Sequence, residues 1–158
     1  MVHISKISVG LLILAGCCIL SAVFLPIWNI YLDAPQYPEG LGLSIYANKL
    51  GGDVEIINGL NHYIGMKTLH AEEFIEFIVL PYIIGFFALW AFVTALFFKT
   101  KRSVVILLVT FMLFGILAMY DFWRWEYDYG HNLNPNDAII VPGMAYQPQL
   151  IGFKQLLN

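Results

Sequence analysis

Three long apolar stretches dominate the pattern of hydrophobic and polar positions along the chain. They run from about Ile7 to Trp28, from about Phe74 to Phe98 and from about Ser103 to Trp123. A helix needs roughly 20 apolar residues to cross the hydrocarbon core of a membrane, and each stretch is long enough to do so. The pattern therefore predicts three transmembrane helices, within the segments 1–30, 74–98 and 103–123.

The polar regions carry weaker signals of regular structure. Apolar and polar positions alternate from Leu41 to Tyr46, which predicts a half-buried strand. From Val54 to Ile64 the apolar residues have helical spacing and predict a short helix. Prolines and glycines from Pro35 to Gly40 predict a turn-rich approach to the strand rather than regular structure.

The composition agrees with a membrane protein. The chain of 158 residues is 59% hydrophobic and only 12% charged, with a mean hydropathy of +0.73, far more apolar than a soluble domain. We therefore expect an all-α membrane protein with three transmembrane helices. The other segments are an extracytoplasmic one at 31–73, a cytoplasmic loop at 99–102 and an extended extracytoplasmic tail at 124–158. The two extracytoplasmic segments are expected to pack together.

The basic residues indicate the orientation, because short loops rich in Lys and Arg stay in the cytoplasm. Lys99, Lys101 and Arg102 form one tight turn, and Lys6 lies near the N-terminus. Placing these residues inside puts the N-terminus in the cytoplasm and the C-terminus outside. All 11 acidic residues then lie outside or at the outer boundary. A negative outer face argues against nucleic acid as a partner and attracts cations.

A second interpretation of the N-terminal stretch is open. The sequence Leu14-Ala15-Gly16-Cys17 has the form of a bacterial lipoprotein cleavage site. Against it, the apolar run continues to Trp28, about twice the length of a signal-peptide core. Cys17 and Cys18 are adjacent and are the only two cysteines, so the extracytoplasmic segments contain no disulfide.

The residues best suited to chemistry follow the predicted short helix. His62, Met66 and His70 are spaced four apart, so a continuous helix would align them on one face. Imidazole and thioether together suit Cu(I), because a thioether is a soft ligand that binds zinc, calcium and magnesium poorly. Met144 or His131 could supply a fourth ligand. The sequence therefore predicts a copper site with these residues as its ligands.

Alternatives to this copper site are also open. Gly65 interrupts the helical spacing, although a bent segment could still bring the same ligands together. His and Met could instead serve only as interfacial and packing residues. Haem ligation by His62 or His70 is a weaker hypothesis, because no C-x-x-C-H motif accompanies them.

An enzyme is not expected, because the sequence lacks the H-E-x-x-H, Walker A and G-x-S-x-G motifs. Aromatic and acidic residues alternate from Tyr120 to Tyr129, at the end of the third apolar stretch. The aromatic residues are typical of a belt at the membrane interface. A cation site among the acidic residues Asp121, Glu126 and Asp128 is the alternative.

Several blocks of the sequence resemble a family of small bacterial membrane proteins. The blocks are Tyr37-Pro38-Glu39-Gly40-Leu41, Leu60-Asn61-His62-Tyr63-Ile64-Gly65-Met66, Val141-Pro142-Gly143-Met144 and a final Gly152-x-Lys154-x-Leu156-Leu157-Asn158 pattern. The family is associated with respiratory gene clusters for nitrous oxide reduction, beside a copper-delivering lipoprotein. The resemblance implies an inner-membrane protein, with that lipoprotein as a candidate partner. It leaves open whether the natural chain continues beyond Asn158.

The resemblance and the ligand-rich segment together predict a function. We expect a metal-handling accessory protein for an extracytoplasmic copper enzyme, in the maturation of nitrous oxide reductase. The alternative is a non-catalytic subunit that stabilises or docks a larger respiratory or maturation complex. Most of the link to copper enzymes comes from the resemblance rather than from the spacing of the ligands.

Overall fold

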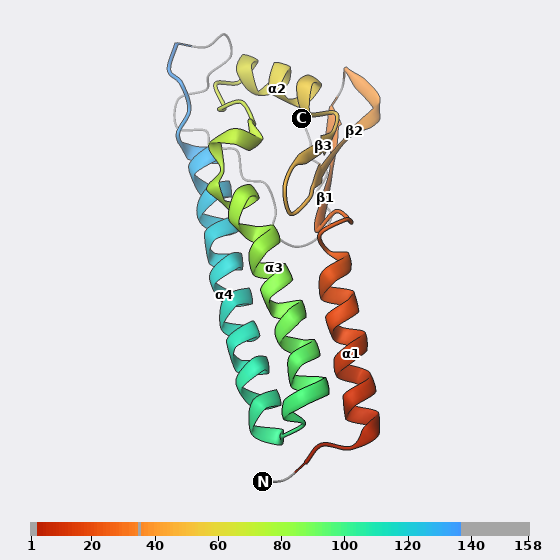
Figure 1. Cartoon of the computed structure of the whole chain (residues 1–158). Helices are drawn as coiled ribbons and strands as arrows, with labels where there is room; N and C mark the ends of the chain where they lie inside the picture. The colour runs from red at the N-terminus through yellow and green to blue at the C-terminus, as the bar shows by residue number, and fades with distance from the viewer. Residues whose placement is uncertain (1–2, 35, 137–158) are drawn as a thin grey trace. The chain divides into compact units, whose positions relative to one another are not determined.

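The computed structural model describes residues 3–34 and 36–136, which divide into two compact units (Figure 1). Unit 1 combines Met1–Ile27, Ile45–Lys49 and Ala71–Leu117. Unit 2 combines Trp28–Ser44, Leu50–His70 and the described part of Ala118–Asn158. Each unit is therefore built from segments that are distant in the sequence.

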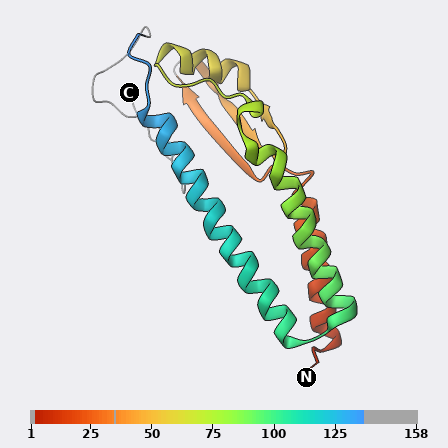
Figure 2. The ribbon, with the colours of Figure 1, turned by 60° about the vertical axis from the view of Figure 1, so that its left-hand side comes forward.

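Unit 1 is helical. Helix α1 (Lys6–Ser21) begins at Ser5, whose hydroxyl oxygen accepts a hydrogen bond from the Ser8 amide at 3.1 Å. It lies along α3 (Ile75–Val93), as Figure 2 shows. Helix α3 continues into the π-helix η2 (Thr94–Phe98), and a turn at Lys99 then leads into α4 (Lys101–His131). Helix α4 belongs to unit 1 as far as Leu117 and to unit 2 beyond it.

The prediction of an all-α protein with three transmembrane helices is wrong. Among the described residues, two helices are long and apolar enough to cross a membrane, Ile75–Phe98 with 24 residues and Lys101–His131 with 31. Helix α1 has only 16 residues, fewer than the roughly 20 that a span needs. It ends at Ser21 and turns follow. Pro26 prevents the helix from resuming, because it disfavours helical backbone at Leu25, and from Trp28 the chain forms a strand.

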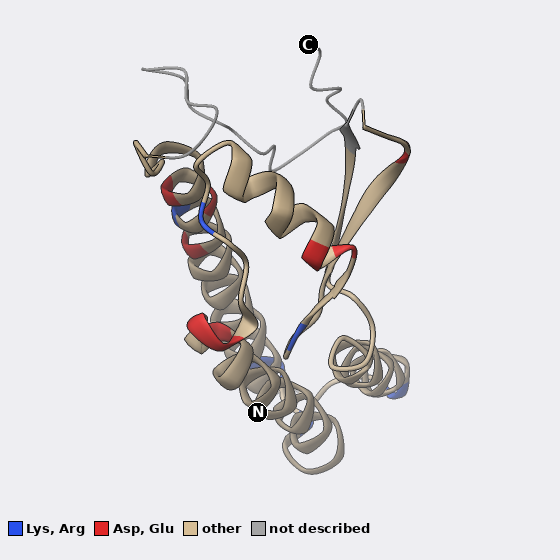
Figure 3. Cartoon of the chain, turned by 90° about the horizontal axis from the view of Figure 1, so that it is seen from above, with Lys and Arg blue, Asp and Glu red and all other residues tan. Residues whose placement is uncertain are grey.

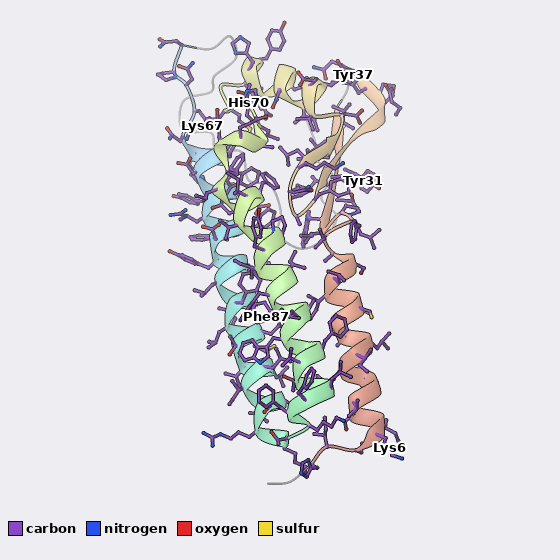
Figure 4. The ribbon with its side chains drawn as sticks, viewed as in Figure 1. Lys6, Tyr31, Tyr37, Lys67, His70 and Phe87 are labelled. Carbon is purple, nitrogen blue, oxygen red and sulfur yellow. The ribbon has the colours of Figure 1, made fainter. Side chains whose placement is uncertain are left out.

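The core of unit 1 lies around Phe87 of α3 (Figure 4). Its ring is 4% exposed and contacts Phe111 and Phe114 of α4, with ring centroids 5.3 and 5.5 Å apart. Gly16 of α1 lies directly against the ring of Phe92 of α3. Most other apolar side chains of α3 and α4 are exposed, unlike those of a buried core helix in a soluble protein.

Unit 2 contains a three-stranded sheet in the order β1 (Trp28–Ala34), β2 (Tyr37–Ile45), β3 (Leu50–Gly52). The single strand predicted from Leu41 to Tyr46 corresponds to the buried half of β2, but β1 and β3 were not predicted. The start of β1 reads as the end of an apolar span, and the prolines and glycines before Leu41 read as a turn. Neither pattern indicates a strand, because the pairing of these strands depends on contacts between residues that are distant in the sequence.

The chain turns from β3 into the helix of unit 2 at Gly52 and Asp53, next to Gly42 of β2. Gly52 has a φ of 85°, and a Cβ at this position would lie 2.1 Å from the Gly42 carbonyl oxygen. The Asp53 amide donates to that oxygen, and the Asp53 carboxylate accepts from the Gly42 amide, both at 2.8 Å. The predicted short helix follows as α2 (Val54–Tyr63), which confirms that prediction.

Candidate functional site

The chain turns back after α2 and does not continue as a helix. Gly65 has a φ of 73°, in the left-handed region that glycine favours. The Met66 amide donates to the Asn61 carbonyl at 2.9 Å, and residues 66–70 then form an irregular segment, which we call the return segment. The 3-10 helix η1 (Ala71–Glu73) and then α3 follow. His62, Met66 and His70 therefore do not share one helical face, because the backbone bends at Gly65.

Two buried asparagines of α2 hold the return segment. Asn58 donates from Nδ2 to the Leu69 carbonyl at 3.0 Å and accepts from the Leu69 amide at 2.6 Å. Asn61 donates to the Lys67 carbonyl at 3.3 Å. These side chains replace the backbone partners that irregular buried backbone lacks. The position of the return segment is thus determined by α2.

The end of α4 contacts the other side of the return segment. The Lys67 ammonium donates to Asp128 Oδ2 at 2.7 Å, and the Tyr129 hydroxyl donates to the Thr68 carbonyl at 3.4 Å. The Asn134 amide donates to the Gly65 carbonyl at 2.8 Å. Figure 3 shows the acidic residues of α4 beside the basic position of this segment. Among the described residues, these contacts join 65–68 to 128–134, parts of the two polar regions that were expected to pack together.

An open cleft of about 420 Å³ lies between the return segment and the residues after α4. It is formed entirely by unit 2. Its lining residues come from two parts of the chain: His62, Gly65, Met66, Lys67, Thr68, Asn132, Leu133, Asn134 and Pro135.

The cleft brings together two of the predicted copper ligands. His62 and Met66 both line it, from the end of α2 and the start of the return segment. His70 is exposed on the same segment, near Lys67 in Figure 4, but is not among the lining residues. The ring of His131 stacks on Tyr127 with centroids 3.8 Å apart and is also not part of the lining. Met144 lies outside the described residues.

Asn132 and Asn134 are cleft residues that sequence reasoning missed. They follow α4 and are about 70 positions from His62 in the sequence, so no local spacing connects them. Among residues 3–34 and 36–136, no group of three or more His, Cys, Asp or Glu side chains could hold a metal ion. The lining side chains that carry neutral donor atoms are the imidazole of His62, the thioether of Met66, the hydroxyl of Thr68 and the amides of Asn132 and Asn134.

The outer turns of α4 hold two carboxyl groups with opposite pKa shifts. They lie beyond the third apolar stretch, which ends at about Trp123. The hydrogen bond from Lys67 holds the pKa of Asp128 below its usual value. Burial raises the pKa of Glu126 from 4.5 to about 7, and its Oε1 accepts no hydrogen bond from any described residue. The two groups therefore differ in charge state near neutral pH.

Comparison of the chain with known protein families, with curated proteins and with solved structures finds no match.

Proposed function

We propose that the protein is a copper-handling accessory protein that binds Cu(I) transiently at the cleft of unit 2. The observation that carries this proposal is that His62 and Met66, four positions apart on a bent backbone, line the same open cleft. In this proposal copper is a cargo that is received and released.

The donor set supports Cu(I) over other metals. A thioether is a soft ligand, and an imidazole with a thioether suits Cu(I), whereas zinc, calcium and magnesium prefer harder or more numerous anionic ligands. The Lys67 ammonium would repel a cation, but its charge is offset by the Asp128 carboxylate at 2.7 Å. A volume of about 420 Å³ is much larger than one ion, which suits access by a partner that delivers or removes it.

The proposed setting is the bacterial inner membrane. Two of the described helices could each cross a membrane by length and composition. We place the turn from Lys99 to Arg102 in the cytoplasm, because short basic loops stay inside. Unit 2 would then face outward, where a copper-delivering lipoprotein and an extracytoplasmic enzyme such as nitrous oxide reductase are the proposed partners. This context rests on the family resemblance in the sequence.

Cu(I) titration of the detergent-purified chain, under anaerobic conditions against a competing chromophoric chelator, tests the proposal. We expect His62→Gln and Met66→Leu each to weaken binding by at least about tenfold, because loss of a direct ligand should cost no less than loss of a supporting residue. The leucine keeps the volume of Met66 and removes only the thioether.

Matched controls make the titration specific. His3→Gln and Met112→Leu change the same residue types at exposed positions in unit 1 and should leave affinity unchanged. His70→Gln tests whether His70 also binds Cu(I), although it does not line the cleft. Equal Cu(I) affinity in wild type, His62→Gln and Met66→Leu would refute the proposal.

A second candidate function is that of a docking subunit, and one observation favours it. Tyr120, Trp123 and Tyr127 form an exposed aromatic row on α4, with successive ring centroids 6.0 and 5.7 Å apart. Exposed aromatic rows occur at protein interfaces and at membrane interfaces. Docking predicts that Trp123→Ala and Tyr127→Ala release a co-purifying partner while Cu(I) binding is unchanged. A chain that is monomeric after mild solubilisation, with no partner, would argue against it.

A further inference from the structure

Four exposed basic side chains gather at one end of unit 1. Lys99, Lys101 and Arg102 occupy the turn between η2 and α4, and Lys6 begins α1. Figure 4 shows Lys6 projecting outward from the first turn of its helix. We call these four residues the basic end.

Backbone pairing assembles the basic end from two distant segments. The Ile4 amide donates to the Lys99 carbonyl at 2.9 Å, and His3 forms an antiparallel bridge with Thr100. Lys99 itself has a φ of 49°, and its amide closes the turn on the Thr94 carbonyl at 2.9 Å. Lys6 is therefore held beside the turn rather than on an independent N-terminal arm.

The positive charge of the basic end is not balanced locally. No described residue forms an ion pair with any of the four side chains. The acidic residues of unit 1 are Glu72, Glu73 and Glu76, before or within the first turn of α3. They lie at the opposite end of 24 helical residues, a distance of roughly 35 Å at 1.5 Å per residue. This is several times the Debye length of about 8 Å at physiological salt.

We propose that the basic end binds the phosphate headgroups of anionic phospholipids. The basic end lies where one of the two long apolar helices ends and the other begins. It is therefore at the depth of the headgroups if these helices span the bilayer. Long Lys and Arg side chains at a helix end extend toward that region. Anionic headgroups attract such clusters, whereas zwitterionic headgroups offer no net charge. The inference rests on the proposed membrane insertion and is independent of copper binding.

Lipid selectivity of the full-length chain tests this inference. The protein is reconstituted from detergent into nanodiscs of equal parts phosphatidylglycerol and phosphatidylcholine with identical acyl chains, and native mass spectrometry counts the lipids retained. Wild type should retain phosphatidylglycerol preferentially. Lys99→Gln/Lys101→Gln should lower the ratio of retained phosphatidylglycerol to phosphatidylcholine by about fivefold per charge, equivalent to about 1 kcal/mol each. Lys6→Gln should also lower it, because the pairing of His3 with Thr100 holds Lys6 at the same site.

A matched variant separates a local site from the effect of net charge. Lys49→Gln/Arg124→Gln removes the same two charges outside the basic end and should leave the ratio unchanged. All the substituted side chains are exposed, and circular dichroism verifies that each variant folds. Equal retention of both lipids by wild type, or equal losses in the two double variants, would overturn the inference. If Lys6→Gln leaves the ratio of retained phosphatidylglycerol to phosphatidylcholine unchanged, Lys6 is not part of the lipid site.

Discussion

The Lys67 ammonium donates a hydrogen bond to the Asp128 carboxylate at 2.7 Å, across 61 positions of sequence. The other oxygen of the same carboxylate accepts from the Asn132 side-chain amide at 3.4 Å. Lys67 and Asn132 line the cleft from its two different segments. Asp128 therefore connects the two walls of the cleft without being part of its lining.

Replacing Asp128 by Asn should loosen the cleft with little loss of stability. The Lys67 and Asp128 side chains are 46% and 51% exposed, and such pairs contribute at most about 1 kcal/mol. We expect faster hydrogen exchange at the amides of residues 66–68 and weaker Cu(I) binding at unchanged stoichiometry. Asp121→Asn is the control, because it removes an equally simple ion pair, with Arg124, inside one helix. Identical exchange in both variants would contradict the proposed connection.

The same pair predicts how the return segment responds to acid. The pKa of Asp128 is lowered in the folded chain, so its stabilising effect is complete above the unfolded value of about 3.8 and is lost as pH falls through the folded value. The protection factors of the amides of residues 66–68, which remove the intrinsic pH dependence of exchange, should therefore fall below about pH 4 in wild type and depend less on pH in Asp128→Asn.

Asn58→Ala should destabilise unit 2 much more than the loss of the surface ion pair. The buried Asn58 amide satisfies both the N–H and the C=O of Leu69, which is itself buried. Leaving both groups without partners should cost roughly 2–4 kcal/mol. Thermal unfolding in detergent measures the effect, and Cu(I) affinity should fall with it. Asn48→Ala, at an exposed position, should change neither property.

Local patterns were sufficient for α2 and the two long apolar helices, and insufficient for the end of α1 and for the sheet. The apolar spacing from Val54 to Ile64 predicted α2, because that spacing reports an amphipathic face that is local in sequence. The strand β1 could not be distinguished from the end of a transmembrane helix, because its aromatic and aliphatic residues continue directly from an apolar run. Within that run, Pro26 is the residue that most disfavours a helix.

The candidate site was predictable in part for the same reason. His62 and Met66 are close in sequence, so their proximity could be inferred despite Gly65. The contributions of Asn132 and Asn134 could not be inferred, because they depend on how α4 packs against the return segment. The burial of Glu126 was not predicted either, because it depends on how the end of α4 packs against other segments.

Gly16→Leu should weaken the packing of α1 on α3. A Cβ at Gly16 would lie 2.8 Å from Cε1 of the Phe92 ring, so the ring or the helix must move. Overpacking of this kind costs about 1–3 kcal/mol. Gly10→Leu is the matched control in the same helix, because nothing lies within 4 Å of a Cβ there. Equal thermal midpoints for the two variants would show that α1 and α3 are not closely packed at Gly16.

Glu126→Gln should remove a pH dependence of stability. Glu126 is 4% exposed and its folded pKa is about 7, against 4.5 for the free side chain. A raised pKa means that the folded chain favours the protonated carboxyl, so ionisation destabilises wild type progressively from pH 4.5 to 7 and fully above that range. At 1.4 kcal/mol per pKa unit the cost above pH 7 is roughly 3 kcal/mol.

The neutral amide of Glu126→Gln keeps the shape of the protonated carboxyl and cannot ionise. The variant should therefore match wild type near pH 4.5 and unfold at a higher temperature at pH 8. Glu73→Gln, at an exposed position, controls for the change in net charge and should follow the wild-type pH profile. If wild type and Glu126→Gln show parallel unfolding temperatures from pH 4.5 to 8, folding does not raise the pKa of Glu126. Its carboxylate would then need a cationic or hydrogen-bonding partner within unit 2.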